Sequence, residues 1–323
     1  MKLRGGIDLG GTKIQAVVVD EQHRVVGQAR QLTPNTGGPR DVAMAMAATL
    51  QEAAQQAKVE ARQLAGVGIG SPGLSDARRG TVARAGNLPG WQEPFPLCAA
   101  LSESLGIPAY LGNDVGVALD AEALIGAGKD CDSFIGVFWG TGIGGGVILH
   151  HERWLGRGSS GEIGHMVVKQ NGAKCACGRR GCLEAYAGRR SMEARARLDV
   201  ERGVKTELFA IMKKKGRTQL ASGVFAKAIE DRDKYTIRLL DRAVQALGIG
   251  LASACNLLDV EAVVVGGGLG SRLGQPYADK IAAAMLPYLF TRDHPPKVKV
   301  AALGDLGGAI GASLLVPGKT PPS

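Results

Sequence analysis

Three of the six cysteines in this chain lie within eight residues, and a histidine stands shortly before them. They are Cys175, Cys177 and Cys182, with His165 ten residues upstream of the first. Their loop is charged and rich in glycine, so it offers no apolar face that would bury three thiols as packing residues. Thiolates and imidazole are preferred ligands of Zn²⁺, and four protein ligands leave no open coordination position. The cluster therefore predicts a structural zinc site.

Disulfides are the alternative for clustered cysteines. They are rare in the cytosol, and we expect a cytoplasmic protein because MKLRGGIDLG runs directly into a strand pattern without an apolar signal region. The other three cysteines stand in apolar or helical surroundings, which favours buried packing positions. They are Cys98, Cys131 and Cys255.

Three glycine-rich turns each follow an apolar strand pattern: DLGGTK at 8–13, GTGIGGG at 140–146 and VVVGGGLG at 263–270. Backbone N–H groups in such turns can bind phosphate oxygens. Each turn alone is equally well explained by the backbone freedom of glycine, whereas three in this order are more specific. None is a Walker motif or a dinucleotide fingerprint. The candidate nucleotide ligands are Asp8 (for Mg²⁺ or its waters), Gly10, Gly11, Thr12, Lys13, Gly140, Thr141, Gly142, Gly266, Gly267 and Gly268.

A carboxylate, Asp114, stands where a strand pattern gives way to a helix pattern in GNDV at 112–115. Phosphoryl transfer to an alcohol needs a group that accepts the hydroxyl proton, and helix N-terminal amides would keep this carboxylate ionised. An ordinary helix N-cap is the alternative. The residues alone favour the cap.

The elements that position these residues form an α/β pattern long enough for two domains. Strand, glycine turn and strand follow one another at 7–20 and again at 133–149, which indicates two related domains. We expect a smaller domain at 1–117 plus about 299–323, and a larger one at 118–298 that holds the zinc loop. Helices are expected from Asp41, as the cap, to about Lys58, near 97–105, from just after Asp114 to about Gly126, and at 236–258. Helical stretches are expected near 184–198 and 206–231.

Charge and hydropathy exclude some partners. The formal net charge is +9, but the Lys and Arg residues are scattered without interleaved aromatics. This favours a solvated basic surface over nucleic-acid binding. The sequence has no run of 18 apolar residues, so it predicts no membrane-spanning helix.

The motifs together resemble those of the ROK family of sugar kinases and sugar-responsive repressors, within the actin-like ATPase superfamily. The resemblance covers nearly the whole chain and rests on DLGGTK, GSPG, NLPGW, GNDV, GTGIGGGVI, GEIGH, CACGRRGCLE and VVVGGG. It implies two actin-like ATPase (ribonuclease H-like) domains with nucleotide and sugar in an interdomain cleft, and a homodimer or homotetramer.

The resemblance also assigns roles to residues. It makes Asp114 the general base, which reverses the preference for a cap. The sugar contacts that it implies are Asn87, Asn113, Asp114, Glu162, His165 and Glu184. Glu162 and Glu184 have the alternative of solvated or capping acids, and Glu184 could open the helix that follows. Many members have Asn where this chain has Gly116, so the resemblance does not decide which sugar fits.

The predicted activity is ATP-dependent phosphorylation of a hexose at its 6-hydroxyl, with glucose as the first choice. ATP, Mg²⁺ and structural Zn²⁺ are the predicted cofactors. The same scaffold serves N-acetylglucosamine, N-acetylmannosamine and fructose kinases. A sugar-responsive regulator is the alternative outside enzymes, but family repressors carry an N-terminal helix-turn-helix, whereas here the phosphate hairpin begins at Ile7.

Overall fold

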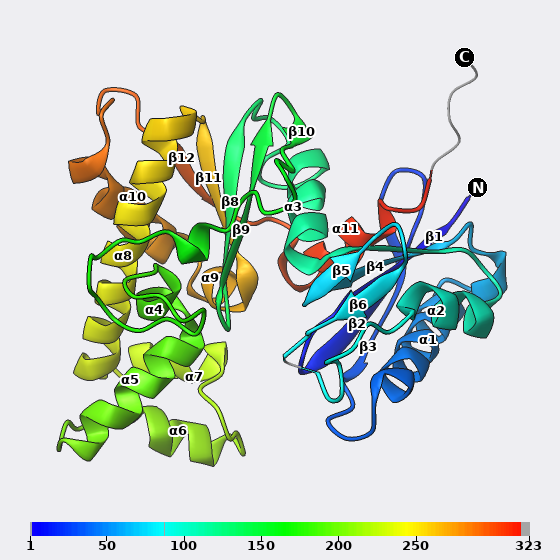
Figure 1. The fold of residues 1–323 in the computed structure, drawn as a ribbon, viewed down its shortest axis with the longest axis horizontal. Coiled ribbons are helices and arrows are strands. Elements are labelled where there is room, and N and C mark those ends of the chain that lie inside the picture. Colours follow the sequence, from blue (N-terminus) through cyan, green and yellow to red (C-terminus); the bar gives the residue numbers. More distant parts are fainter. Residues whose placement is uncertain (1, 87, 318–323) are drawn as a thin grey trace. The chain divides into compact units, whose positions relative to one another are not determined.

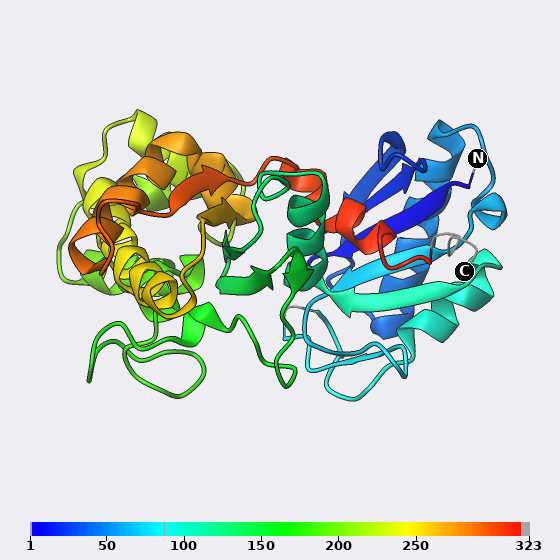
Figure 2. The same cartoon turned by 90° about the horizontal axis from the view of Figure 1, so that it is seen from above.

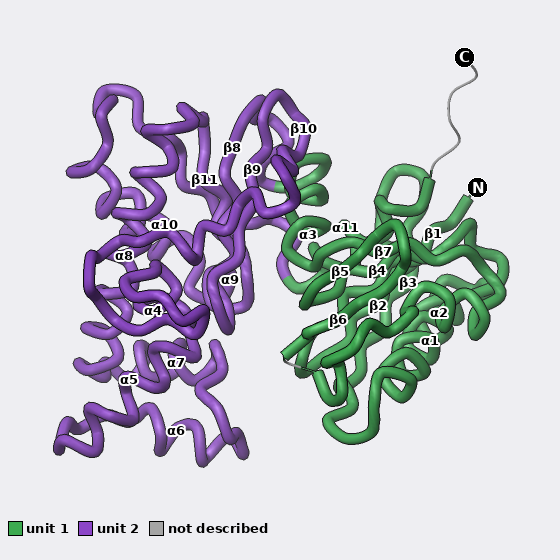
Figure 3. Tube along the Cα trace, in the orientation of Figure 1, with its two compact units in different colours: residues 1–126, 305–323 green, residues 127–304 purple. Residues whose placement is uncertain are grey.

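The computed structural model describes residues 2–86 and 88–317. It divides into two compact units, residues 1–126 with 305–323 and residues 127–304 (Figure 3). Each unit buries its own cluster of apolar side chains, so each has the core that an independent α/β domain needs.

The first unit is built on a five-stranded sheet in the order β3-β2-β1-β4-β7. Three antiparallel strands, β1 (Arg4–Leu9), β2 (Lys13–Val19) and β3 (Val25–Leu32), follow one another along the chain. β4 (Val67–Ser71) and β7 (Ala109–Asn113) extend the sheet in parallel from β1. A small hairpin of β5 (Leu74–Asp76) and β6 (Thr81–Ala83) lies outside this sheet.

Helices cover both faces of this sheet (Figures 1 and 2). Adjacent strand residues point to opposite faces: a side chain at Gly5 would meet Leu50 of α1 (Pro39–Gln56), and one at Gly6 would meet Ala309 of α11 (Gly307–Ser313). A Cβ atom at Gly6 would lie only 2.0 Å from the carbonyl oxygen of Ala309. Glycine is therefore required for this close approach. α2 (Leu97–Leu105) packs beside α1, and α3 (Asp114–Leu124) beside α11.

The start of α1 differs from the prediction. Asp41 is not the N-cap: the helix begins at Pro39 and its N-cap is Gly38. Asp41 is the third helical residue, and its Oδ2 accepts a 2.8 Å hydrogen bond from the backbone N–H of Gly38. The carboxylate still satisfies a free amide of the helix start, but as the acid of a capping box rather than as the cap.

The second unit repeats the sheet of the first. Its strand order is β10-β9-β8-β11-β12, with β8 (Phe134–Trp139), β9 (Ile143–Leu149) and β10 (Glu152–Arg153) antiparallel. β11 (Ala262–Gly266) and β12 (Lys297–Val300) run parallel to β8. The two units thus share strand order and direction, which confirms the predicted α/β repeat.

Seven helices complete the described part of the second unit. They are α4 (Glu184–Ala187), α5 (Arg189–Glu201), α6 (Leu208–Lys214), α7 (Ser222–Glu230), α8 (Lys234–Leu258), α9 (Gly267–Leu273) and α10 (Gln275–Met285). The predicted helical stretch near 184–198 holds α4 and α5, divided at Gly188, and the stretch near 206–231 holds α6 and α7. α10, which the sequence analysis did not predict, lies beside α8 in both views (Figures 1 and 2).

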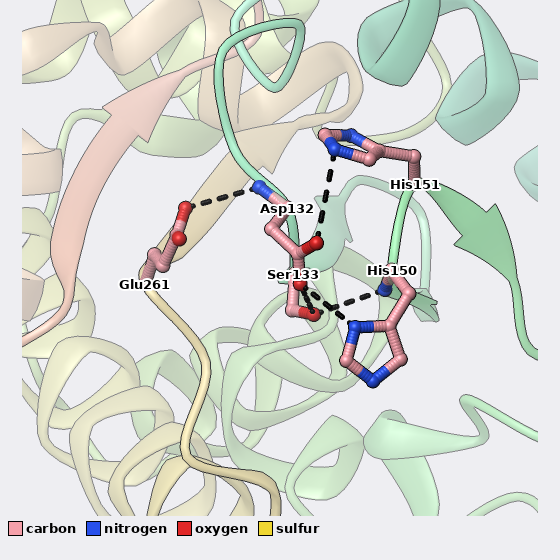
Figure 4. Close-up of polar contacts among 5 residues, drawn as sticks. All are labelled: Asp132, Ser133, His150, His151 and Glu261. Carbon is pink, nitrogen blue, oxygen red and sulfur yellow. Dashed lines mark hydrogen bonds and ion pairs between the residues drawn. The ribbon is translucent and has the colours of Figure 1, made fainter.

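A polar cluster fixes the turn between β9 and β10 (Figure 4). Both turn residues have left-handed backbones, with φ of 52° at His150 and 63° at His151. Asp132 Oδ2 lies 3.1 Å from His150 Nδ1, and Asp132 Oδ1 lies 3.7 Å from His151 Nε2. Glu261, just before β11, accepts a hydrogen bond from the amide of Asp132. The cluster therefore ties the edge hairpin to the centre of the sheet.

No helix in the described ranges 2–86 and 88–317 is long and apolar enough to cross a membrane.

Candidate active site and metal cluster

The first glycine turn joins β1 to β2 and presents unused amides. Gly10 N–H donates to Lys13 O at 3.0 Å, and Thr33 Oγ1 donates to Gly10 O at 2.6 Å. These bonds hold the turn from inside, whereas the amides of Gly11 and Thr12 have no partner among the described residues. Exposed, fixed N–H groups of this kind suit phosphate oxygens.

Asp8 ends this hairpin with a carboxyl group in an enclosed position. Although part of the residue remains exposed, its carboxyl packs on α11, where a Cβ atom at Gly308 would lie 2.7 Å from Asp8 Cγ. Burial raises the pKa of Asp8 to about 7, the charge of Asp114 adds to the rise, and Lys13 opposes it. A bound divalent cation would favour the ionised form, so Asp8 fits a role toward Mg²⁺.

Lys13 has a partner that the sequence analysis missed. Its Nζ lies 3.0 Å from Oδ2 of Asp305. Asp305 lies in a short 3₁₀ turn, Gly304–Leu306, just before α11. The only available signal was its place in the glycine-rich segment GDLGG, which gives no hint of Lys13 as its partner.

Asp114 is the first residue of α3, and it is not the helix N-cap. The cap is Asn113, whose Oδ1 accepts a 3.0 Å hydrogen bond from Gly116 N–H. Asp114 Oδ1 accepts from Val115 N–H at 2.9 Å. Burial raises the pKa of Asp114, while hydrogen bonds from the amides of Val115 and of Asp114 itself act against the rise. Since Asn113 performs the capping, the carboxylate of Asp114 is left for another task.

The second glycine turn, between β8 and β9, has the same form as the first. Gly140 N–H donates to Gly142 O at 3.0 Å, and the amides of Thr141 and Gly142 have no partner in the part of the chain that the structure describes. Glu184, the first residue of α4, accepts a 2.8 Å hydrogen bond from Ile143 N–H through Oε2. Glu184 therefore does open the helix, and it also fixes the end of this turn.

Arg189 is a second residue that the sequence analysis missed. Its Nη2 donates to Thr141 Oγ1 at 2.7 Å, and its Nη1 donates to Ser222 Oγ at 3.1 Å. Burial lowers the pKa of Arg189. The position directly after Gly188 carried no recognisable signal, because its partners lie far away in the sequence.

The third turn, Gly266–Gly268, lies against the second within this unit. Gly267 has φ of 79°, and a Cβ atom there would lie 2.7 Å from the backbone N and O of Trp139. A Cβ atom at Gly140 would lie 3.9 Å from the amide of Gly268. The predicted nucleotide residues at 140–142 and 266–268 are thus neighbours.

The predicted sugar residues have different surroundings. Glu162 is exposed, and its carbonyl oxygen accepts from His165 N–H at 3.0 Å. His165 ends a short 3₁₀ turn, Ile163–His165. Asn113 is exposed at the start of α3. Asn87 lies outside the described residues.

The structure brings together the four predicted metal ligands. One donor atom from each of His165, Cys175, Cys177 and Cys182 lies within 4.8 Å of every other. Cys177 Sγ and Cys182 Sγ are 3.7 Å apart, and Cys175 Sγ is 3.9 Å from His165 Nδ1. Zn–S bonds of about 2.3 Å in a tetrahedron place two sulfurs about 3.8 Å apart. The donor set therefore fits Zn²⁺.

The thiols of this cluster have unequal acidities. A hydrogen bond with the Arg179 side chain lowers the pKa of Cys177 to about 6, whereas burial raises the pKa of Cys175 and of Cys182. A coordinated cation would deprotonate all three. All six cysteines are free thiols in the structure, and none of the three is paired as a disulfide.

Two α/β units with one sheet order, each with a glycine turn between its first two strands, define the actin-like ATPase fold to which sugar kinases belong. A model of the ROK family matches residues 4–319, and the chain belongs to this family. The fold and the family predicted from the motifs are both confirmed.

Individual relatives define the enzyme class. A glucokinase of Thermotoga maritima is 33% identical over 94% of this chain and 95% of its own length. The solved structure of a ROK family glucokinase from Streptomyces griseus, in complex with glucose and AMPPNP, is 31% identical, with a TM-score of 0.80 over 97% of this chain and 98% of that one. The prediction of a sugar kinase is confirmed at the level of class.

Other relatives differ in what they act on. An N-acetylmannosamine kinase of Yersinia pseudotuberculosis is 30% identical over 86% of this chain and 86% of its own length. A ROK family transcriptional regulator, a homolog of the E. coli MLC protein, is 20% identical, with a TM-score of 0.79 over 97% of this chain and 77% of that one. At that identity the likeness shows the fold alone.

Proposed function

We propose that this chain transfers the γ-phosphoryl group of ATP to the 6-hydroxyl of a hexose, with glucose as the preferred sugar. The observation that carries the proposal is that Asp8 and Lys13 flank the first glycine turn and that the charge of Asp114 acts on the Asp8 carboxyl. The similar relatives of this chain include several glucokinases. The side chains of Asp114, Asp8 and Lys13 supply what phosphoryl transfer needs: a proton acceptor, a residue for the metal and a cation for phosphate.

Asp114 is the proposed general base. It accepts the proton of the sugar hydroxyl while the oxygen forms its bond to the γ-phosphorus and the bond to the β-phosphate oxygen of ADP breaks. Asn113 supports this role because it satisfies the helix start through Oδ1 and leaves its amide N–H₂ for a sugar hydroxyl.

The phosphate groups are assigned to the two hairpin turns. The amides of Gly11 and Thr12 in one unit, and of Thr141 and Gly142 in the other, are the unused donors. The third turn, Gly266–Gly268, is assigned to the adenosine. Mg²⁺ bound near Asp8 would neutralise charge on the transferring phosphate.

The remaining sugar contacts are assigned to Glu162, His165 and Glu184, with Asn87 from the family motif. His165 presents Nδ1 to the cysteine cluster, so Nε2 is left for a sugar hydroxyl. Zn²⁺ held by Cys175, Cys177, Cys182 and His165 would fix this imidazole, and with it the segment that carries Glu184.

A coupled ADP-release assay across glucose, mannose, fructose, N-acetylglucosamine, N-acetylmannosamine and allose tests the proposal. We expect the highest kcat/KM with glucose, and for Asp114→Asn a kcat about 10²–10⁴-fold below that of the wild type with every accepted sugar. A higher kcat/KM with N-acetylmannosamine would assign the chain to the activity of its Yersinia relative. Sugar binding without ADP release from any of the six would favour a regulator.

A further inference from the structure

We propose that Arg189 is a positioning residue of the phosphoryl-donor site, which orients the hydroxyl of Thr141 toward a phosphate oxygen and places a positive charge beside the second glycine turn. This inference rests on the proposed function, since it assigns that turn to the donor phosphates. It concerns a residue outside every motif that identified the family.

The hydrogen bond to Thr141 fixes the direction in which the hydroxyl donates. A threonine hydroxyl has one hydrogen and two lone pairs, whereas a guanidinium can only donate. Because Arg189 Nη2 donates to Thr141 Oγ1 at 2.7 Å, the hydroxyl acts as acceptor toward the arginine. Its own hydrogen is then free for a second partner. A phosphate oxygen is an acceptor without a donor, so it matches this hydrogen.

The guanidinium of Arg189 forms no ion pair within the described part of the chain, although the charge of Glu193 acts on it. The side chain is partly buried. The nearest acid along the helix, Glu193, is already bonded to the Arg197 guanidinium and to Leu220 N–H. Burial still outweighs the influence of Glu193 and lowers the pKa of Arg189, so the partly buried cation is incompletely compensated. An anionic ligand would reduce that cost. This points to phosphate independently of the hydroxyl argument.

The backbone holds the turn by other means. Arg189 N–H donates to Gly140 O and Arg190 N–H donates to Thr141 O, each at 3.1 Å. The first amides of α5 are therefore occupied by the turn and do not themselves bind a ligand. Substitution of the Arg189 side chain leaves these bonds in place, so its effect can be separated from loss of the turn.

The test compares Arg189→Met and Arg189→Lys with a matched control, Arg190→Met, which removes the exposed neighbouring arginine. Calorimetry measures dissociation constants for Mg-ADP, Mg-AMPPNP, adenosine and glucose. We expect Arg189→Met to weaken Mg-AMPPNP by about 10- to 100-fold, the usual effect of a lost charged hydrogen bond. Adenosine and glucose should bind as in the wild type. Arg189→Lys should fall between, because lysine keeps the charge but not the fork that contacts Thr141 and Ser222.

A double-mutant cycle with Thr141→Val separates positioning from a purely structural role. If Arg189 acts through the hydroxyl, the two losses of Mg-AMPPNP affinity overlap, and the double variant loses less affinity than the sum of the two single losses predicts. Equal losses for adenosine and AMPPNP, or AMPPNP binding by Arg189→Met within twofold of wild type, would overturn the proposal. If Arg189→Met does not fold, Arg189→Lys and the Thr141 variant give the same decision.

Nucleotide binding is measured without turnover, so the outcome differs from a failure of the proposed function. A wild-type protein that binds Mg-AMPPNP but phosphorylates none of the six sugars contradicts the proposed substrate. The role of Arg189 is then decided separately, by the nucleotide affinities of its variants. A wild-type protein that binds no nucleotide overturns both.

Discussion

Lys13 Nζ lies 3.0 Å from Asp305 Oδ2, so the first glycine turn is bonded to the residue at which the chain returns from the second unit to the first. The lysine side chain is 26% exposed and the aspartate 69% exposed. An ion pair this open contributes at most about 1 kcal/mol to folding. In the nucleotide-free protein, Asp305 therefore pairs only weakly with Lys13, and a phosphate group would compete with it for the same ammonium group.

Asp305→Asn should strengthen nucleotide binding. The substitution removes the competing carboxylate, and we expect Mg-AMPPNP to bind about two- to fivefold more tightly at low salt, with the gain reduced at high salt by screening. Calorimetry at two salt concentrations checks this. Asp293→Asn, which removes another exposed acid, is the control for net charge. Weaker binding in Asp305→Asn would mean that the pair orients Lys13 rather than occupying it.

Asp114→Asn should separate catalysis from binding. The amide keeps the shape of the carboxylate but cannot accept the hydroxyl proton, so kcat should fall by about 10²–10⁴-fold. The dissociation constant for the sugar should stay near that of the wild type. Asn113→Ala is the companion variant: it removes the cap of α3 and should cost about 1 kcal/mol of stability. Normal turnover by Asp114→Asn would exclude this residue as the base.

The features that the sequence predicts well are local. DLGGTK places Asp8, the glycine turn and Lys13 within one hairpin, so strand alternation and turn chemistry determine their positions. The same holds for the turn at 140–142 and for the three cysteines. In each case the interacting residues are close along the chain, and their spacing carries the information.

The features that the sequence does not predict depend on tertiary contacts. Arg189 meets Thr141 and Ser222, and Lys13 meets Asp305, only after separate elements have packed together. Boundaries fail for a related reason: Asp41 and Asp114 both look like caps, but the caps are Gly38, three residues before Asp41, and Asn113, one residue before Asp114. Composition alone does not reveal which residue at a helix start has the extended backbone of a cap.

The raised pKa of Asp8 predicts how stability depends on pH. The folded-state pKa is about 7, against 3.8 for an unperturbed aspartate. The fold tolerates protonated Asp8 better than ionised Asp8. The stability that this residue contributes to the folded state is therefore fully present below pH 3.8 and is lost as pH rises through 7. Asp8→Asn should therefore stabilise the nucleotide-free protein at pH 8 by about 2 kcal/mol, less than the full shift because part of Asp8 faces solvent.

The Asp8 experiment has an internal control of opposite sign. Burial acts to raise the pKa of Asp20, but hydrogen bonds from Arg24 and Gln22 lower it below its ordinary value. Its contribution is present above pH 3.8 and is lost as pH falls through the lowered pKa. Denaturant unfolding at several pH values should show Asp20→Asn destabilised at neutral pH, where Asp8→Asn is stabilised. A pH-independent effect of Asp8→Asn would contradict the buried, protonated carboxyl.

The cysteine cluster predicts one metal ion and a defined consequence of losing it. We expect about one Zn²⁺ per chain, because the four donors form a single tetrahedral set. Cys177→Ala should release the zinc. Cys98→Ala, which removes a free thiol of the first unit, should keep it. Elemental analysis in reducing buffer measures the zinc content of both variants. Zinc loss should weaken glucose binding, because His165 is a zinc ligand and a proposed sugar contact. It should also loosen the second glycine turn, because Cys182 is two residues from Glu184, whose Oε2 accepts a 2.8 Å hydrogen bond from Ile143 N–H. Metal-free protein that keeps wild-type affinity for both glucose and Mg-AMPPNP would show that the cluster does not support the site.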